Sequence, residues 1–458
     1  METVIQNVWS KSKVLVKGLI IGFLVLLLQI PLLYVRELIG EREARQQEAI
    51  AEVSSKWAGR QNITGPVLVL PYWQNTGDTA YVKARSKQYA YFLPDVLNVN
   101  AAVTPQQKHR GIYKVMLYTS DIQLGGSFSN IDLNRLNIAA EDVIWSEAFL
   151  KLHISDVKGL NQEMRMQWKG QQLEFSPLTE THSGEGLMAR LNLASVEDLK
   201  EAAFSTRFGL NGSEQLLFTP VGKATSVTLR SKWPHPSFNG DILPQSTQVS
   251  DSGFTASWKS LAHKRAFPQQ WKGDVYTIRD DLLPNRPVYG RGMDVATSTV
   301  AGSNLSASAF GANLFVPVSG YQKTMRSVKY AALCILLTFA AFFLIETTNK
   351  RSVHPFHYGL VGVALVLFYT LLLSFSEYIG FNASYLVASI ATIGLIGWFV
   401  KSLLQSNRLT GILSFILVLM YTYVFTILQL QDYSLLLGSL GLFITLALIM
   451  YFSRKIQW

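Results

Sequence analysis

The residues that could carry chemistry are few and stand apart in the sequence. His354 and His357 are three residues apart, so one helical turn could bring them together as a metal pair. Two imidazoles do not make a metal site, however, and Pro355 between them interrupts a helix. Asp280 and Asp281 precede a Leu-Leu-Pro segment and fit a turn better than a pair of catalytic carboxylates.

The sequence motifs of common catalytic sites are also missing. The chain has no Gly-x-Ser-x-Gly elbow, no Walker loop, no paired-cysteine cluster and no His-Glu-x-x-His. We therefore predict a protein that is not an enzyme, with no catalytic residue, no metal and no cofactor.

A short loop with two prolines, Trp233-Pro-His-Pro236, is a candidate recognition element. The prolines would fix its shape and leave His235 displayed. A structural turn between two strands explains the same residues, and both interpretations stay open. Trp233 and His235 are candidate interaction residues on this basis.

Three basic residues and one acid form a second candidate. Lys323, Arg326 and Lys329 are spaced by three, so they share a face if the segment is helical. Glu377 ends an apolar segment, where a carboxylate usually has a partner or a task. Three interpretations of Glu377 remain: an ion pair with Arg326, interfacial anchoring, or a role in transport. Anionic lipid headgroups are the other expected partner of the basic cluster.

Six apolar segments must position these residues. A helix rises about 1.5 Å per residue, so crossing an apolar layer of about 30 Å takes roughly 20 residues. The predicted spans are 18–35, 329–345, 358–375, 383–400, 409–430 and 435–452. The first has no small-residue cleavage site after it and is interpreted as a retained anchor. The second is short and would rely on Lys329 and Glu346 reaching the headgroups.

The charges of the short loops predict the orientation. Basic residues precede the first span and follow the second, fourth and sixth, whereas the other short loops carry only Glu377 and Asp432. This positive-inside pattern places the N-terminal residues 1–17 and the tail 453–458 in the cytoplasm. The segment between spans one and two would then be periplasmic.

Net charge gives no sign of a nucleic-acid partner. The chain carries +10, but Arg36 to Arg326 contains 31 basic and 27 acidic residues, so the large segment is only about +4. The single cysteine, Cys334, lies in the second span, so the exported segment must fold without a disulfide.

A helix and then many strands are expected in the large segment. Residues 36–59 have helical periodicity and are interpreted as a stalk, or alternatively as a helix packed on the domain. Residues 60–328 are β-rich, with period-two runs typical of a β-sandwich. The expected strands are Val67–Leu70, Tyr89–Leu93, Tyr113–Thr119, Phe149–Ile154, Arg165–Trp168, Leu187–Leu193, Glu214–Phe218, Ser226–Arg230, Phe254–Trp258 and Asn313–Val316.

A weak internal echo raises the question of duplication. Val115–Thr119 followed by Gly125–Phe128 is similar to Val227–Ser231 followed by Pro236–Phe238, with an offset that differs by two residues. Duplication and chance both explain it.

Several segments resemble the CreD-type inner-membrane proteins of Gram-negative bacteria. They are Arg42-Glu-Ala-Arg45, Gly65-Pro-Val-Leu-Val-Leu-Pro-Tyr72, Gly209-Leu-Asn-Gly-Ser213, Trp233-Pro-His-Pro-Ser-Phe238, Gly253-Phe-Thr-Ala-Ser-Trp258, Tyr321-Gln-Lys-Thr-Met-Arg-Ser-Val-Lys-Tyr330, Val353-His-Pro355 and Leu371-Leu-Leu-Ser-Phe-Ser-Glu-Tyr-Ile-Gly-Phe381. The resemblance covers essentially the whole chain. It implies an inner-membrane protein that maintains cell-envelope integrity, linked to a two-component system that responds to carbon source and cell-wall stress. It brings no catalytic residue.

The sequence thus predicts a six-span α-helical membrane protein, one span plus five, with a β-rich periplasmic domain between the first two. Its expected partners are the lipid bilayer and a periplasmic or envelope component bound by the domain. The alternative function is a transporter or lipid-handling protein that uses the last five helices, although few charges lie within them.

Overall fold

Two compact units make up the chain. The computed structural model describes residues 16–75, 85–129, 131–178, 186–276, 278, 304–314, 320–349, 353–430 and 434–453. One unit, here called the helical unit, combines Met1–Glu48 with Val318–Trp458, and the other, the β-rich unit, is Ala49–Pro317. Several residues used in the sequence analysis lie outside the described residues. They are Asp280, Asp281, Asp432 and the basic residues that follow the second and sixth predicted spans, Lys350, Arg351, Arg454 and Lys455.

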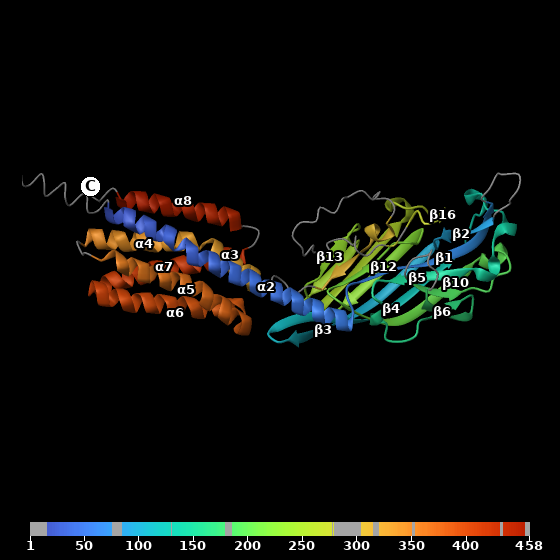
Figure 1. Ribbon diagram of the computed structural model, residues 1–458, viewed down its shortest axis with the longest axis horizontal. Coiled ribbons are helices and arrows are strands. Elements are labelled where there is room, and N and C mark those ends of the chain that lie inside the picture. Colours follow the sequence, from blue (N-terminus) through green and yellow to red (C-terminus); the bar gives the residue numbers. More distant parts are fainter. Residues whose placement is uncertain are drawn as a thin grey trace, which may run out of the picture. The chain divides into compact units, whose positions relative to one another are not determined.

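The helical unit is a bundle of apolar helices (Figure 1). The first helix is Val16–Trp57, of which Gln29–Trp57 is α2. The others are α3 (Gly320–Lys329), α4 (Ala331–Thr348), α5 (Pro355–Ile379), α6 (Phe381–Leu404), α7 (Asn407–Gln429) and α8 (Ser434–Ser453). Among the described residues, four helices are long and apolar enough to cross a membrane, or five if α3 and α4, bent by 44°, count as one.

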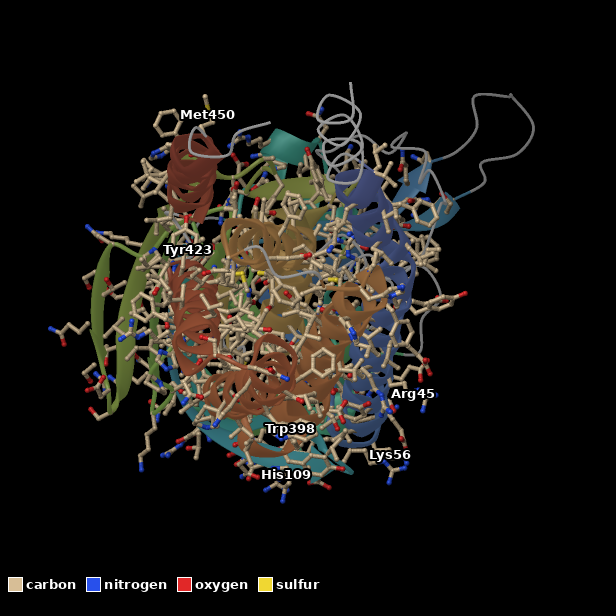
Figure 2. All side chains as sticks on the ribbon, turned by 90° about the vertical axis from the view of Figure 1, so that its left-hand side faces the viewer. Arg45, Lys56, His109, Trp398, Tyr423 and Met450 are labelled. Carbon is tan, nitrogen blue, oxygen red and sulfur yellow. The ribbon has the colours of Figure 1, made fainter. Side chains whose placement is uncertain are left out.

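The long apolar helices coincide in position with predicted spans. The first helix, α5 and α6 contain 18–35, 358–375 and 383–400. α7 contains all of 409–430 except its last residue, and α4 contains most of 329–345. The sixth crossing, 435–452, falls on α8 and stays a prediction. Apolar side chains such as Trp398 and Met450, 75% and 64% exposed, project from the bundle (Figure 2). A surface of this kind fits a lipid environment.

Local sequence explains where the helices begin and end. Pro355 is at the start of α5, where its missing N–H costs nothing, and the His354 side chain caps that helix by accepting from the Phe356 N–H. Gly380 alone separates α5 from α6, at φ 79°, which a residue without Cβ adopts readily. These two features fix the hairpin that presents Glu377.

The β-rich unit contains two sheets. The nine strands of the first, sheet A, are β1 (Gln61–Asn75), β2 (Arg85–Phe92), β5 (Phe149–Ile154), β8 (Ser176–Pro177), β9 (Leu187–Arg190), β11 (Gln215–Phe218), β13 (Ser237–Gly240), β16 (Gln270–Lys272) and β17 (Phe310–Asn313). The eight of the second, sheet B, are β3 (Val96–Arg110), β4 (Tyr113–Phe128), β6 (Arg165–Trp168), β7 (Gln171–Glu174), β10 (Ala202–Ser213), β12 (Ala224–Ser231), β14 (Ser246–Ser250) and β15 (Gly253–Leu261).

A single large hydrophobic cluster contains side chains of both sheets. In β3, Leu97, Val99, Ala101 and Val103 are buried while their neighbours in sequence are exposed, as expected for a strand with one face on a core. β3 lies between β4, to which it is antiparallel, and β12, to which it is parallel. Long-range pairing of this kind places β3 at the centre of sheet B.

One expected strand is displaced, and the internal echo, left open between duplication and chance, falls on unlike strands. Of the strand expected at Asn313–Val316, residues 315 and 316 lie outside the described residues, and only Asn313 is in a strand, as the last residue of β17, Phe310–Asn313. Gly311 allows β17 to approach β11, since a Cβ there would lie 2.2 Å from the Leu216 carbonyl oxygen. The positions of the internal echo give no support to the duplication and leave chance as its explanation. Its first copy lies on one strand, β4, whereas its second is divided between β12 in sheet B and β13 in sheet A.

The end of α2 packs on the β-rich unit. Glu52 forms an ion pair with Arg110 at the tip of β3, at 2.9 Å, and the Trp57 indole N–H lies 3.5 Å from the Tyr118 carbonyl oxygen. Within Ala49–Trp57, the interpretation as a helix packed on the domain is therefore the better one.

We expect residues 49–317, produced without the helical unit, to fold as a soluble β protein. The unit has its own core, and the only cysteine of the chain, Cys334, lies outside it, so a reducing agent should change nothing. Circular dichroism with and without reductant is the measurement. A mainly helical spectrum would contradict the expectation.

Candidate functional site

Glu377 lies at the end of α5 in a small polar cluster. Its side chain is 10% exposed, and its Oε1 accepts a hydrogen bond from the Tyr321 hydroxyl at 3.0 Å. Arg42 of the first helix places its Nε 3.9 Å from the same oxygen. Three helices, α2, α3 and α5, therefore meet at this carboxylate.

The predicted pair of Glu377 with Arg326 is wrong. Among the described residues the ion pair of Glu377 is with Arg42. Tyr321 faces Glu377, and Arg326 follows Tyr321 by five residues, which is about 140° around the α3 axis. The guanidinium of Arg326 is consequently turned away from the carboxylate.

The basic cluster is on a helix, as its spacing predicted. Lys323, Arg326 and Lys329 all belong to α3. The Lys323 ammonium lies 5.8 Å from the centroid of the Phe381 ring, at the start of α6, in a cation–π contact. Lys329 is exposed, and Arg326 is partly exposed.

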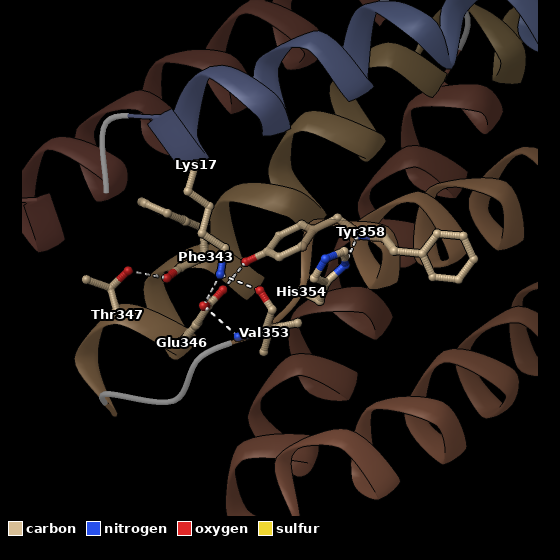
Figure 3. Close-up of polar contacts among 8 residues, drawn as sticks. Lys17, Phe343, Glu346, Thr347, Val353, His354 and Tyr358 are labelled. Atoms are coloured by element: carbon tan, nitrogen blue, oxygen red, sulfur yellow. Dashed lines mark hydrogen bonds and ion pairs between the residues drawn. The ribbon is translucent and has the colours of Figure 1, made fainter. Parts of the chain in front are cut away.

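A second acid, Glu346, is the centre of a cluster that sequence reasoning missed (Figure 3). Glu346 ends α4 and is buried, with 5% of its surface exposed. Lys17 of the first helix forms an ion pair with its Oε1, and the Val353 N–H donates to the same oxygen at 2.9 Å. The Tyr358 hydroxyl donates to Oε2 at 2.7 Å.

The expectation that Glu346 reaches the headgroups is therefore wrong. A buried carboxylate needs a cation and hydrogen-bond donors around it, and Lys17, Val353 and Tyr358 supply both. The signal that could have found this site is an acid and a base, each at the boundary of an apolar span. What the sequence lacked was the packing that brings the two together.

The two clusters have the same composition. In each, a glutamate at a helix end receives a tyrosine hydroxyl and a cation from the first helix, Lys17 in one and Arg42 in the other. These two cations are about 37 Å apart along a helix of 1.5 Å rise per residue, close to the full thickness of a bilayer. The first helix is thus attached to the bundle near both of its membrane ends.

An apolar stripe joins the two clusters. Its buried side chains recur at helical spacing and are Ile21, Leu28, Leu32, Val35 and Ile39. At Leu28 the helix packs onto a residue without a side chain, since a Cβ at Gly362 would lie 2.2 Å from Leu28 Cδ1. Small residues allow such close approach between membrane helices.

The structure bears on both interpretations of the loop Trp233-Pro-His-Pro236, as a recognition element and as a structural turn. The Trp233 indole N–H donates to the His235 carbonyl oxygen at 2.9 Å, and the two rings meet edge to face at 6.3 Å. His235 is exposed, whereas Trp233 packs against the core of the β-rich unit. The loop is held by its own contacts, and only His235 is displayed.

The other candidates have structural partners. His354 caps α5, and its ring centroid is 6.4 Å from that of His357. Within the described ranges no group of three or more His, Cys, Asp or Glu residues could hold a metal ion. In β5, burial lowers the pKa of Lys151 to about 8, and Asp274 opposes the shift. That shift follows from packing between β1 and β9 and assigns no reaction to Lys151.

The comparison with known proteins decides the family. A family model described as "Inner membrane protein CreD" matches residues 13–458. The chain belongs to the CreD family. The protein named "Inner membrane protein CreD" of Escherichia coli strain K12 is 30% identical to it over 439 residues, which are 95% of this chain and 91% of that protein.

Membership in the CreD family confirms the resemblance inferred from the sequence. A CreD protein is by that description an inner membrane protein, and the apolar helices of the helical unit agree with it. The CreD name indicates no enzymatic activity. It also identifies neither the acid clusters nor the loop at Trp233 as sites, so their roles rest on the geometry above.

Proposed function

We propose that this CreD protein is a non-enzymatic envelope factor whose β-rich unit binds a partner or ligand of the cell envelope. In this proposal the chain crosses the inner membrane six times, with α8 as the last crossing and both termini in the cytoplasm. The β-rich unit is periplasmic, and its two sheets form a β-sandwich over their shared core. The loop charges and the family support this arrangement.

The observation that carries the binding role is a groove on sheet B whose lining includes several amide side chains. It has a volume of about 530 Å³ and is lined by side chains of β3, β4, β6, β7 and β10. Asn98, Asn100, Gln123 and Gln167 contribute amide groups to it. The guanidinium of Arg207, also in the lining, is paired with Asp121. Exposed amide groups both donate and accept hydrogen bonds, which suits a ligand rich in hydroxyl or amide groups.

Blocking the groove is the direct test of this function. Ser205 lines the groove, and an indole at this position would fill it. We therefore expect Ser205→Trp to abolish protection of the envelope when the variant replaces the wild-type protein in cells. Protection is measured as survival in detergent and as leakage of a periplasmic enzyme. Ser250→Trp, on the exposed strand β14 of the same sheet, is the matched control and should protect as the wild type does. Equal loss in both variants, or in neither, would contradict the role of the groove.

Topology can be tested with single cysteines. In a Cys334→Ser background, His109→Cys at the exposed end of β3 should react in intact cells with a maleimide that does not cross the membrane. Asn407→Cys, at the start of α7, should react only after the membrane is opened. The reverse result would invert the proposed orientation. A fluorescent protein that folds only in the cytoplasm should fluoresce when it is fused to the C-terminus. A fusion that does not fluoresce would contradict the sixth crossing.

A further inference from the structure

Helix α3 lies at one end of the bundle, at the level of the turn between α5 and α6. The Tyr321 hydroxyl reaches Glu377 at the end of α5, and Lys323 reaches the Phe381 ring at the start of α6. The next helix, α4, has 18 residues and is about 27 Å long, which is close to the thickness of the hydrocarbon layer. With α4 in the hydrocarbon, α3 occupies the headgroup layer.

The surroundings of α3 have the character of a membrane interface. Tyr378, beside Glu377, is 76% exposed, and Ile379 is 53% exposed. Exposed tyrosine next to exposed aliphatic side chains is typical of the boundary between hydrocarbon and water. One face of α3 is buried through Tyr321, Thr324, Ser327 and Val328, so the helix is held against the bundle.

The remaining face of α3 is basic. Lys323, Arg326 and Lys329 follow one another at intervals of three and fall within about 120° of the helix circumference. Among the described residues, no ion pair joins any of them to a carboxylate. Glu377, at the end of α5, is already bound by Arg42 and Tyr321. Within the described part of the chain, these three positive charges therefore have no protein partner of opposite sign.

We propose that this face of α3 binds the phosphate headgroup of an anionic phospholipid. The three cations match a phosphodiester in charge, and the cation–π contact with Phe381 holds Lys323 at the end of α6. The acyl chain of such a lipid could pack on the apolar surface of α4. Leu336 on that helix is 50% exposed and lies seven residues after Lys329, which is two helical turns or about 10 Å. A basic headgroup site next to an apolar surface fits a lipid better than free phosphate.

Lipid-dependent thermal unfolding of the full-length protein tests this site. Cys334 is the only cysteine and is buried, so a dye that fluoresces on reaction with a thiol reports unfolding of the helical unit. In lipid-depleted neutral detergent, phosphatidylglycerol should raise the unfolding temperature at concentrations where phosphatidylcholine with the same chains does not. In the double variant Arg326→Gln/Lys329→Gln, the phosphatidylglycerol concentration for half of this effect should rise about thirtyfold.

The matched control removes one lysine and one arginine elsewhere. Lys401→Gln/Arg408→Gln, at the ends of α6 and α7, should keep the wild-type response to phosphatidylglycerol. Both variants should unfold like the wild type in phosphatidylcholine; if the α3 double variant does not, Lys329→Gln alone replaces it, with an expected shift of about fivefold.

Three outcomes would overturn the site. They are a wild type without preference for phosphatidylglycerol, an α3 variant that responds like the wild type, and an equal loss in the control variant. Glycerol phosphate that protects at the concentration of the lipid would show a free phosphate site instead, and so would also refute the lipid assignment. None of these outcomes bears on the groove of sheet B, so the two proposals fail separately.

Discussion

Glu346→Ala is expected to lower the unfolding temperature of the helical unit by roughly 6 to 20 °C. The substitution leaves the Lys17 ammonium partly buried, together with the unpaired Val353 N–H and Tyr358 hydroxyl. Breaking a buried ion pair by removing one partner costs about 3–5 kcal/mol, and in a domain of this size each kcal/mol corresponds to roughly 2–4 °C. Reaction of Cys334 with a fluorogenic thiol dye measures the temperature.

Two further variants separate the ion pair from the mere loss of a side chain. Lys17→Met/Glu346→Met removes both charges and should recover most of the lost stability, because an apolar pair replaces the buried ions. Glu41→Ala removes the exposed pair of Glu41 with Arg45, four residues apart on the first helix, and should change the temperature by no more than about 2 °C. A Glu346→Ala protein as stable as the Glu41→Ala protein would show that the cluster does not attach the first helix.

Gly362→Leu is expected to displace the first helix from α5. The new Cβ would lie 2.2 Å from Leu28 Cδ1 and 2.9 Å from Phe339 Cζ, so both side chains must move and the added δ-methyl groups have no space. Overpacking of this kind costs about 1–3 kcal/mol, which corresponds to roughly 2–12 °C in the same assay. Limited proteolysis of the first helix in detergent gives a second measurement, since a displaced helix is cleaved faster.

Gly359 provides the control for this substitution. It lies on the same helix, three residues earlier, and a Cβ there has no atom within 4 Å. Gly359→Leu gains the same helix propensity, so it should leave the protein unchanged or slightly more stable. Leu28→Ala should rescue Gly362→Leu in part by returning the space. If Gly359→Leu destabilises as much as Gly362→Leu, the close approach at Leu28 is not what holds the helix.

The apolar helices could be predicted because their signal is local. A long apolar run specifies a membrane helix wherever it stands in the chain, so α5, α6 and α7 were placed within a few residues. The clusters at their ends could not be predicted. Lys17 and Glu346 are separated by 329 positions, and their contact depends on how the helices pack. The error at Arg326 has the same origin, since spacing identifies a face and not the element that it meets.

Some strands could likewise be predicted from the sequence, and others could not. Phe149–Ile154 and Arg165–Trp168 were predicted with their observed bounds, because apolar and polar residues alternate there between clear turns. β3 and β10 were missed. The alternation of β3 was readable, but Asn98, Asn100 and the two alanines Ala101 and Ala102 weaken the β-forming signal. Its long pairing with β4 and β12, which only the fold supplies, makes it a strand.

The parallel pairing of β3 with β12 sets the order of events during biogenesis. Eight consecutive residues of β3, Val96–Val103, depend on Ala224–Ser231 for one of their two neighbours. The chain is synthesised from its N-terminus, so β3 and β4 can form their hairpin long before β12 has been synthesised. Until then the backbone edge of β3 is unpaired and the apolar face of the hairpin is uncovered. A nascent chain stopped anywhere between residues 128 and 224 is thus a ready template for strand addition from another copy. We therefore expect the yield of folded protein to rise when chaperones hold the chain at this stage or when residues 128–224 are synthesised faster.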